Sequence, residues 1–570
     1  MNLDSWKKSC ELNDLTRKSG LEWNFDHRKG DVFVRFMDGA RTNVAYNCLE
    51  RNIARGYGSR IAYLWEGNEP SDSSSITYQE LLDRVITFSA VLRSHGVRKG
   101  DVVGIYLPMI VELPIAMLAC ARIGAVHSVV FAGFSADSLS SRLIHANSRL
   151  LITCDAFFRG KKLIPIKHIA NAAVAACSKE GSEVDKVIVV RHLDRVHRAN
   201  GVNIPKIEYD ESRDVFYDEE MERCKGVESP VEWNEAEDPL FILYTSGSTG
   251  KPKGVVHTTA GYMTYAYATT KYVFDTHPDS DIYWCTADCG WITGHSYLVY
   301  GPLTNGLTSI IFEGIPTYPT PSRMWQVVEK YKVTTLYTAP TAVRALMAFG
   351  DQYVRCCDRS SLRILGSVGE PINPAAWRWF RNCIKRAWPG ICRTVFGDHS
   401  RYVSTYFSSF PGFFFSGDGA RRDDDGYLWI TGRVDDLMNV SGHLLSTAEI
   451  ESALVSDDDV VEAAVVAAPH DIKGSFPYAF VSLRNGVQLT DEKVNNLKQL
   501  VRRVIGAIAV PDVIQEAPGL PKTRSGKVTR RILRKIAEGD QGADLGDTTT
   551  LLDESVISHL WTGRMSMRTG

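Results

Sequence analysis

The strongest constraint on the fold is a regular alternation of short apolar runs with segments long enough to form a helix. The runs "DVVGIYL" (101–107), "AVHSVVF" (125–131) and "DKVIVVR" (185–191) are largely apolar throughout, not only at every second position. Strands that are buried on both faces have this composition, and they are typical of parallel sheets covered by helices on each side. Because the pattern continues to about residue 430, the sequence predicts a large α/β body.

One helix is marked especially clearly, between residues 77 and 96. Thr77 is suited to cap its start, and Gly96 is suited to end it. Between them, apolar residues recur at helical spacing and would lie on one face. These residues are Leu81, Leu82, Val85, Phe88, Val91 and Leu92.

The pattern of apolar and charged residues changes after "TGRVDD" (431–436). The stretches "AEIESALVSDDDVVEAAVV" (448–466), "DEKVNNLKQLVRRVIG" (491–506) and the basic "LPKTRSGKVTRRILRKIA" (520–537) outline a small module of mixed helices and strands. We therefore predict an N-terminal domain of residues 1–432, a hinge at 433–436 and a small, mobile α+β domain of residues 437–570.

Composition excludes several classes of protein. The chain has 570 residues and a formal net charge of −2, so it presents no broad basic field for nucleic acid. Its most apolar stretch, 102–134, is interrupted by two prolines and two charged residues, which predicts buried core and not a membrane span. No secretory signal opens the sequence, so we expect a cytoplasmic protein, with organellar and nuclear locations left open.

The twelve cysteines are scattered and show no zinc-type pairing. Cys285 and Cys289 in "CTADC" come closest to a metal pair, but no second pair or histidines accompany them. Reduced thiols packed inside the protein are the favoured interpretation.

A glycine-rich stretch, "YTSGSTGKPKG" (244–254), follows the apolar run "PLFIL". Glycines let backbone N–H groups converge on an anion, hydroxyl groups add donors, and Lys251 and Lys253 add positive charge. The spacing differs from that of the Walker loop. We predict a phosphate-binding loop; a flexible linker is the alternative, but it would not be expected to carry lysines after an apolar strand.

This loop resembles the nucleotide loop of the adenylate-forming superfamily. Longer stretches, including "DCGWITGHSYLVYGPL" (288–303), "FEGIPTYP" (312–319), "GSVGEPINPAAW" (366–377) and "LPKTRSGKVTRRILRKIA", are similar to the AMP-forming acetyl-CoA synthetases, from about residue 31 to the C-terminus. The resemblance implies that acetate and ATP form an acetyl-adenylate with release of pyrophosphate, and that CoA then displaces AMP.

The resemblance also implies the nucleotide-binding residues, with Mg²⁺ accompanying ATP. Those expected at the phosphates are Thr245, Ser246, Gly247, Ser248, Thr249, Gly250 and Lys251, those at adenine are Gly369, Glu370 and Pro371, and those at ribose and phosphate are Asp418 and Arg433.

By the same resemblance, Lys527 is the catalytic residue, whose ammonium offsets charge developing during adenylation. The small domain would pivot at Asp435 between the two half-reactions. The residues expected to bind CoA are Arg159, Gly160, Lys161, Lys162, Thr293, Ser441, Gly442 and Arg502. An acetyltransferase or deacetylase acting on Lys527 is a further expected partner.

Three smaller inferences follow from the resemblance. Ile292 and Val368 match acyl-pocket positions and suit a small acid, acetate or, as the second choice, propionate. Val455, Asp457 and Val460 align with a metal site of the family. His295 admits two interpretations, a packed histidine of the core or pocket wall and a proton-transfer group.

The sequence departs from the family pattern after Arg386. There the family continues to an aromatic-Trp-Gln-Thr-Glu-Thr-Gly motif, which this chain lacks; instead "IKR" runs directly into "AWPGI" (387–391). The missing segment implies lost contacts to adenine, phosphates and acetate, and lost sheet strands, which would expose apolar surface and unpaired backbone edges. Two hypotheses stay open, an active ligase and a catalytically impaired isoform that keeps binding surfaces. Residues 1–30 also match the family poorly, so we expect a shortened N-terminus.

Overall fold

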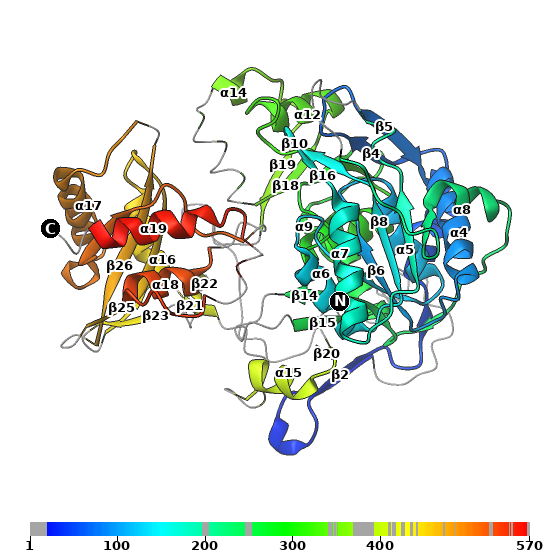
Figure 1. Ribbon diagram of the computed structural model, residues 1–570, viewed down its shortest axis with the longest axis horizontal. Helices are drawn as coiled ribbons and strands as arrows, with labels where there is room; N and C mark the ends of the chain where they lie inside the picture. Colours follow the sequence, from blue (N-terminus) through cyan, green and yellow to red (C-terminus); the bar gives the residue numbers. More distant parts are fainter. Residues whose placement is uncertain are drawn as a thin grey trace. The chain divides into compact units, whose positions relative to one another are not determined.

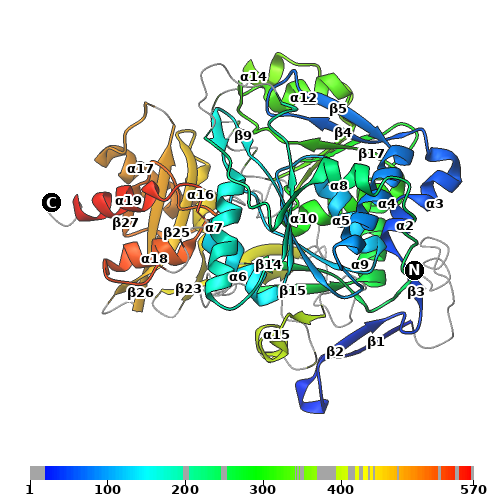
Figure 2. The same cartoon turned by 45° about the vertical axis from the view of Figure 1, so that its right-hand side comes forward.

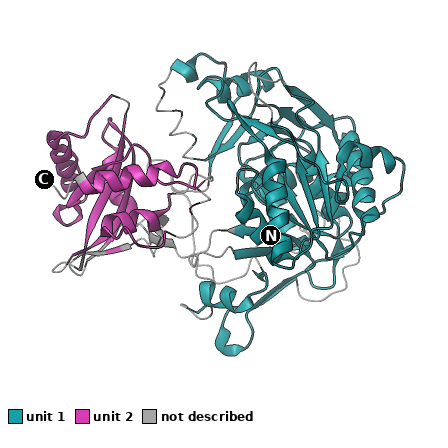
Figure 3. Cartoon of the chain, viewed as in Figure 1, with its two compact units in different colours: residues 1–342, 349–368, 384–414 teal, residues 343–348, 369–383, 415–570 magenta. Residues whose placement is uncertain are grey.

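The computed structural model describes residues 20–196, 205–245, 253–339, 352–368, 393–408, 418–422, 428–433, 437–440, 443–470, 474–484, 486–523, 528–545 and 551–566, with a few single residues between these ranges. Contacts divide the chain into two compact units (Figure 3). The first consists of residues 1–342, 349–368 and 384–414, and the second mainly of residues 415–570.

An eight-stranded sheet forms the centre of the first unit, in the order β12-β11-β8-β6-β7-β14-β15-β20. Its strands are β6 (Val102–Tyr106), β7 (Val126–Val129), β8 (Leu150–Cys154), β11 (Lys186–Val190), β12 (Asp214–Phe216), β14 (Pro239–Thr245), β15 (Lys253–Thr258) and β20 (Thr394–Val395). The strands from β12 to β14 are parallel, and β15 is antiparallel to both of its neighbours. The sheet is thus mostly parallel, as predicted, with an antiparallel end.

Helices cover both faces of this sheet. They are α4 (Tyr78–Ser94), α5 (Glu112–Arg122), α6 (Ala136–Ala146), α7 (Ile166–Lys179) and α8 (Tyr217–Arg223). Helices α6 and α7 lie together on one face, and α4, α5 and α8 lie on the other (Figures 1 and 2).

A six-stranded sheet in the order β19-β18-β16-β17-β4-β5 completes the core of the first unit. Its strands are β4 (Ile61–Glu66), β5 (Ser73–Thr77), β16 (Ile282–Cys285), β17 (Thr308–Phe312), β18 (Thr335–Thr338) and β19 (Ile364–Ser367). All pairs are parallel except β4 with β5. The helices between these strands are α9 (Thr259–Val273), α11 (Gly301–Asn305), α12 (Arg323–Tyr331) and α14 (Gln352–Arg355).

Short elements fill the rest of the first unit. They are β1 (Leu21–Asn24), η1 (His27–Lys29), β2 (Phe33–Phe36), β3 (Arg41–Thr42), α2 (Val44–Cys48), α3 (Glu50–Asn52), η2 (Ile53–Tyr57), β9 (Phe157–Arg159), β10 (Lys162–Ile164), β13 (Asn234–Glu235), α10 (Ile292–Gly294), η3 (His295–Tyr300) and α15 (His399–Tyr406).

Helix α4 confirms the prediction for residues 77–96. The Thr77 hydroxyl accepts a hydrogen bond from the backbone N–H of Glu80, and the Glu80 carboxylate accepts one from the N–H of Thr77, which makes a capping box. All six residues of the predicted apolar face are buried. Gly96 follows the helix with a φ of 86°, a left-handed conformation that favours glycine.

The apolar stretch 102–134 forms β6, α5 and β7, and nearly all of its residues are buried. This confirms that it is core. Among the residues that the structure describes, no helix combines the length and the apolar character needed to cross a bilayer.

The second unit is built around a three-stranded sheet, β25-β26-β27. Its elements are β21 (Asp418–Arg422), β22 (Leu428–Arg433), β23 (Leu437–Val440), β24 (His443–Ser446), α16 (Thr447–Val455), β25 (Val460–His470), β26 (Gly474–Leu483), α17 (Asp491–Val504), η6 (Ala507–Ala509), β27 (Val513–Glu516), α18 (Arg530–Glu538) and α19 (Ser555–Ser566).

Alternate residues of its strands enter two separate cores. On β26, Ala479 and Val481 pack with α16 and α17, whereas Tyr478 and Phe480 pack with α18 and α19. Because successive side chains of a strand point to opposite faces, this sheet is covered on both sides. The unit contains the small α+β domain that the sequence predicts, and it also includes β21 and β22, which the prediction assigned mainly to the N-terminal domain. The predicted hinge falls largely outside the described residues, since Arg433 ends β22 and residues 434–436 are not described.

Candidate active site

The predicted phosphate loop joins two antiparallel strands, β14 and β15. Thr245 ends β14 and is paired with Lys253 at the start of β15. Residues 246–252, including Ser246 to Lys251, lie outside the described residues. Gly254 is required by packing, since a Cβ there would lie 2.9 Å from Ile242 Cγ2. A strand–loop–strand connection differs from the strand–loop–helix of a Walker loop, in agreement with the sequence spacing.

The carboxyl ends of β16, β18 and β19 collect several hydroxyl groups at one edge of the six-stranded sheet. The Thr286 hydroxyl donates to Thr338 Oγ1 at 2.8 Å, and the N–H of Val368 donates to the Thr338 carbonyl at 3.0 Å. The Ser367 hydroxyl is buried and has no hydrogen-bond partner among the described residues. Such edges are where open α/β sheets bind ligands.

Two predicted acyl-pocket residues belong to this edge. Val368 directly follows β19 and is half-buried, and Ile292 begins α10, after β16, with a side chain that is 40% exposed. The predicted adenine residues Gly369, Glu370 and Pro371 come next in the chain but lie outside the described residues. The hydroxyls of Thr286, Thr338 and Ser367 were not predicted, because only strand order brings them together.

The predicted CoA residues Arg159 to Lys162 form the tight turn of the β9/β10 hairpin, in which Arg159 pairs with Lys162. Gly160 has a φ of 61°, and a Cβ there would lie 3.1 Å from Ile315 Cδ1, so both backbone and packing favour glycine. Lys161 and Lys162 are exposed. The turn therefore presents two ammonium groups from a fixed backbone.

A buried side chain that the sequence did not reveal holds this turn. Asn68, which is 5% exposed, donates from Nδ2 to the Gly160 carbonyl at 3.0 Å and accepts the Gly160 N–H at 2.7 Å on Oδ1. One amide thus satisfies both backbone groups of the glycine. No local signal marks Asn68, because its partner is 92 residues away.

Arg159 and Asp288 interact near the start of α10, which carries the predicted CoA residue Thr293. The Arg159 guanidinium lies 5.6 Å from the centre of the Phe131 ring, and burial lowers its pKa, with the charge of Asp288 acting in the opposite direction. Burial raises the pKa of Asp288 to about 6, although a hydrogen bond from Gly290 N and the charge of Arg159 oppose the shift. No local sequence pattern marks Asp288 as a titratable group of this region, because its burial arises from tertiary packing.

His295 is fully buried and packs against Phe241 and His127. Burial lowers its pKa to about 4, and its Nδ1 lies 3.1 Å from the Trp291 carbonyl. A neutral, enclosed imidazole of this kind supports the packing interpretation over proton transfer.

In the second unit, strand pairing brings together two predicted nucleotide residues. Asp418 and Arg433 are 15 positions apart in sequence but stand directly opposite each other at one end of the β21/β22 hairpin. Arg502 is exposed near the end of α17. The predicted residues Asp435, Ser441, Gly442 and Lys527 lie outside the described residues.

The predicted metal residues Val455, Asp457 and Val460 surround the turn between α16 and β25. There Lys493 Nζ lies 2.7 Å from Asp457 Oδ1 and 2.6 Å from Asp459 Oδ2. The described residues contain no cluster of three acidic, cysteine or histidine ligands. Valine can bind a cation only through its backbone carbonyl, so the predicted site would consist of two carbonyls and the Asp457 carboxylate, which is paired with Lys493 in the structure. The metal site stays a prediction.

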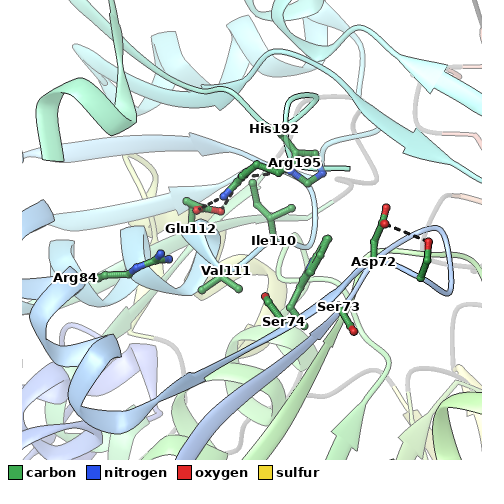
Figure 4. A pocket seen from close by; sticks show the side chains of 11 residues that line it. Asp72, Ser73, Ser74, Arg84, Ile110, Val111, Glu112, His192 and Arg195 are labelled. Atoms are coloured by element: carbon green, nitrogen blue, oxygen red, sulfur yellow. Dashed lines mark hydrogen bonds and ion pairs between the residues drawn. The ribbon is translucent and has the colours of Figure 1, made fainter. Parts of the chain in front are cut away.

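A cavity of about 360 Å³ lies elsewhere in the first unit (Figure 4). Its charged groups are partly paired already, since Arg195 Nη1 lies 2.7 Å from Glu112 Oε1 and Arg195 Nη2 lies 3.2 Å from Glu112 Oε2. It is lined by Trp65, Ser71, Asp72, Ser73, Ser74, Arg84, Ile110, Val111, Glu112, His192 and Arg195. None of the predicted site residues lines it, so it is separate from the candidate active site.

The chain belongs to the family of AMP-binding enzymes. The family described as "AMP-binding enzyme" matches residues 49–393, and "AMP-binding enzyme C-terminal domain" matches residues 449–527. The chain is 49% identical to an acetyl-coenzyme A synthetase of Drosophila melanogaster, covering 95% of this chain and 90% of the fly protein. It is also 49% identical to an acetyl-coenzyme A synthetase of Bradyrhizobium diazoefficiens, covering 99% and 94%. A protein of Arabidopsis thaliana named acetyl-coenzyme A synthetase, chloroplastic/glyoxysomal, matches at 49% over 94% of this chain and 80% of its own length.

These alignments are longer than the chain. They extend over 610 positions with the fly protein and 627 with the bacterial one, whereas the chain has 570 residues. The relatives therefore contain internal residues without a counterpart in this chain, as expected if it lacks the family segment after Arg386. The 386/387 junction itself lies outside the described residues.

Proposed function

We propose that the protein is an AMP-forming acetate–CoA ligase, which makes acetyl-CoA from acetate, ATP and CoA. One observation carries the proposal, namely 49% identity to acetyl-coenzyme A synthetases of an insect and a bacterium over at least 95% of the chain. The identity extends over both units, and a two-step reaction of this kind needs the residues assigned to each.

In the first step, an acetate oxygen bonds to the α-phosphorus of ATP, and the bond to pyrophosphate breaks. Thr245 to Lys251 would hold the leaving phosphates, and the Lys527 ammonium would offset charge on the carboxylate and α-phosphate oxygens. Asp418 would accept hydrogen bonds from the ribose hydroxyls, and Arg433, paired with it across the hairpin, would contact phosphate. Gly369, Glu370 and Pro371 would bind adenine, and Mg²⁺ would neutralise phosphate charge.

In the second step, the CoA thiol displaces AMP from the acetyl carbonyl. The phosphates of CoA carry several negative charges, which suit the exposed Lys161 and Lys162 on their clamped turn. Arg159, Gly160, Thr293, Ser441, Gly442 and Arg502 complete the proposed CoA contacts. The pivot at Asp435 belongs to the same proposal.

The finer biological assignments are also proposals. A cytoplasmic location is the simplest reading of the sequence, and the Arabidopsis relative carries the words chloroplastic/glyoxysomal in its name. Acetylation of Lys527 would remove the charge that the first step needs. Peptide mass spectrometry that finds only unmodified Lys527 across growth states would contradict this regulation.

A catalytically impaired isoform is the second candidate. It is favoured by the absence of the Trp-Gln-Thr-Glu motif and by alignments longer than the chain. The lost groups would contact the transition state, and each such contact is worth about 3 kcal/mol.

The test is product analysis with the purified chain. We expect acetyl-CoA, AMP and pyrophosphate to form in equal amounts from acetate, ATP and CoA, with propionate as a slower substrate and Lys527→Ala as the inactive control. ADP as the product would contradict the proposed chemistry. Thioester formation that Lys527→Ala leaves unchanged would contradict the assigned catalytic residue.

A further inference from the structure

Two cysteines adjacent in sequence, Cys356 and Cys357, place their sulfur atoms side by side. They follow α14, and their Sγ atoms are 3.6 Å apart. Cys356 also donates from Sγ to the Tyr353 carbonyl at 3.3 Å. Adjacent cysteines do not have the spacing of metal ligands, so no sequence pattern marked this pair.

The pair differs from the other described cysteines in its access to solvent. Among the nine described free cysteines, Cys356 alone is exposed, and Cys357 is 8% exposed beneath it. The remaining seven, such as Cys224 and Cys285, are buried away from solvent. Reactivity of a thiol with dissolved reagents needs access, so Cys356 is the described thiol best placed to react first.

We propose that Cys356 and Cys357 are a reversible oxidation site, a vicinal dithiol that a low-molecular-weight disulfide such as oxidised glutathione converts into an intrachain disulfide. The Cys356 thiolate attacks one sulfur of the oxidant and releases one reduced thiol. Cys357 then gives its proton to solvent, attacks Cys356 Sγ and releases the second reduced thiol. Both protein thiols are oxidised and the reagent disulfide is reduced to two thiols, so electrons and protons balance.

The surroundings assign different roles to the two sulfurs. Burial, together with the hydrogen bond to Cys356, raises the pKa of Cys357 to about 11, so Cys357 is protonated at neutral pH. It is therefore poorly suited to attack first, but it is already in contact with the sulfur that it must attack second. Proximity makes this second step intramolecular and fast.

The chain just after the pair is anchored, so ring closure would be local. Lys332 Nζ lies 2.9 Å from Asp358 Oδ2, and Asp358 N donates to Glu329 Oε1 at 3.1 Å. Adjacent Cα atoms are about 3.8 Å apart, below the usual disulfide span of about 4.4–6.8 Å. Such a bond is expected to be readily reduced, which suits a reversible site.

The test uses the full chain and peptide mapping by mass spectrometry after incubation with oxidised glutathione. In the wild type, the peptide carrying both cysteines should lose the mass of two hydrogen atoms, carry no glutathione and recover with dithiothreitol. Cys357→Ser should accumulate one glutathione on Cys356, and Cys356→Ser should leave Cys357 unmodified. Cys224→Ser is the buried control and should behave as the wild type. A stable glutathione adduct on wild-type Cys356, or a disulfide from either residue to another cysteine, would overturn the proposal.

A second measurement does not depend on the oxidised state. Phenylarsine oxide, a trivalent arsenical that binds paired thiols, should occupy the pair in the wild type at one arsenic per chain, protecting both cysteines from alkylation. Each single variant should lose this binding by on the order of tenfold or more. Equal binding by the wild type and Cys356→Ser would contradict a dithiol site.

Discussion

The two edge strands of the six-stranded sheet, β5 and β19, are built in opposite ways. On β5, the serines 73 to 75 are exposed and polar, and the neighbouring strand β4 ends in Glu66, which is fully buried between Arg323 and Lys330. On β19, Leu365 is 66% exposed, although its register partner Leu336 on β18 is fully buried. Polar residues on an edge strand discourage unwanted pairing, whereas an exposed apolar edge invites it.

The difference predicts where the departure from the family would have its effect. In-register residues of neighbouring parallel strands point to the same face of the sheet. Leu336 and Leu365 therefore share a face, and the residues that bury Leu336 leave Leu365 on β19 exposed. The missing segment after Arg386 was expected to remove strands and expose apolar surface; β19 ends the sheet among the described residues, and because residues 369–392 are not described, the loss of strands stays a prediction. Among the described residues, β5 ends the sheet with polar side chains, and β19 ends it with an exposed leucine next to Val368, a proposed acyl-pocket residue.

The largest effect is expected on the β5 side of the six-stranded sheet, at Glu66. Glu66→Gln removes the carboxylate that faces Arg323 and Lys330, at 2.7 Å from each, and leaves both cations without it. Breaking one partner of a buried ion pair costs about 3–5 kcal/mol. Chemical unfolding should show this loss in the free energy of unfolding. A decrease of less than about 1 kcal/mol would mean that the β5 side of the sheet does not depend on Glu66.

Restoring the missing segment should cover β19, the other edge strand of the six-stranded sheet. We expect that inserting the corresponding segment of the fly relative at 386/387 raises acetate-dependent activity about 100-fold, through regained contacts to the transition state. The same insertion should slow hydrogen exchange of the β19 amides. A glycine–serine insert of equal length is the control, and an equal gain with that insert would argue against specific contacts.

A smaller effect is expected at Asp288, which follows the middle strand β16. Its pKa is raised from 3.8 to about 6, so the folded state holds the proton more tightly than the unfolded state. Its contribution to stability is therefore greatest below pH 4 and falls as the pH rises to 6. Relative to the wild type, Asp288→Asn should gain about 2 kcal/mol between pH 4 and pH 7, and a stability difference between the two chains that does not change with pH would contradict the raised pKa.

The next effect concerns the β9/β10 turn, the proposed CoA contact, which is supported by Asn68 in the connection between β4 and β5. Asn68→Ala removes both hydrogen bonds to Gly160, so we expect the KM for CoA to rise about tenfold while kcat changes less than about twofold. Asn68→Asp keeps the acceptor for Gly160 N, so its KM for CoA should lie between those of the wild type and Asn68→Ala. An unchanged KM in Asn68→Ala would separate the turn from CoA binding.

The smallest effect is expected on β19 itself. Leu365→Ala should change the free energy of unfolding by less than about 0.5 kcal/mol, because the side chain is mostly in water. Its matched control, Leu336→Ala on the paired position, should cost about 2–5 kcal/mol. Similar costs for the two leucines would mean that both edges of the sheet are covered.

Much of the fold could be predicted from local patterns, because apolar runs and caps are local signals. The capping box of α4, the buried stretch 102–134, the burial of the "CTADC" cysteines and the small α+β fold of the second unit all followed from such signals. Local patterns could not predict how the strands divide between two sheets or that β15 is antiparallel, since strand order depends on contacts distant in sequence.

The candidate site divides in the same way. Glycines and lysines of the phosphate loop and the basic turn can be recognised in the sequence. Only tertiary contacts bring other groups to the candidate site, namely Asn68, Asp288 and the hydroxyls of Thr286 and Thr338. The pairing of Asp418 with Arg433 depends on a hairpin register that no local pattern specifies.

Acetate-dependent exchange of radioactive pyrophosphate into ATP tests the central claim most directly, because it reports the first half-reaction without CoA. We predict exchange by the wild-type chain that requires acetate and falls on the order of 100-fold or more in Lys527→Ala. No acetate-dependent exchange by a folded wild-type chain would contradict the account and leave the catalytically impaired isoform as its replacement.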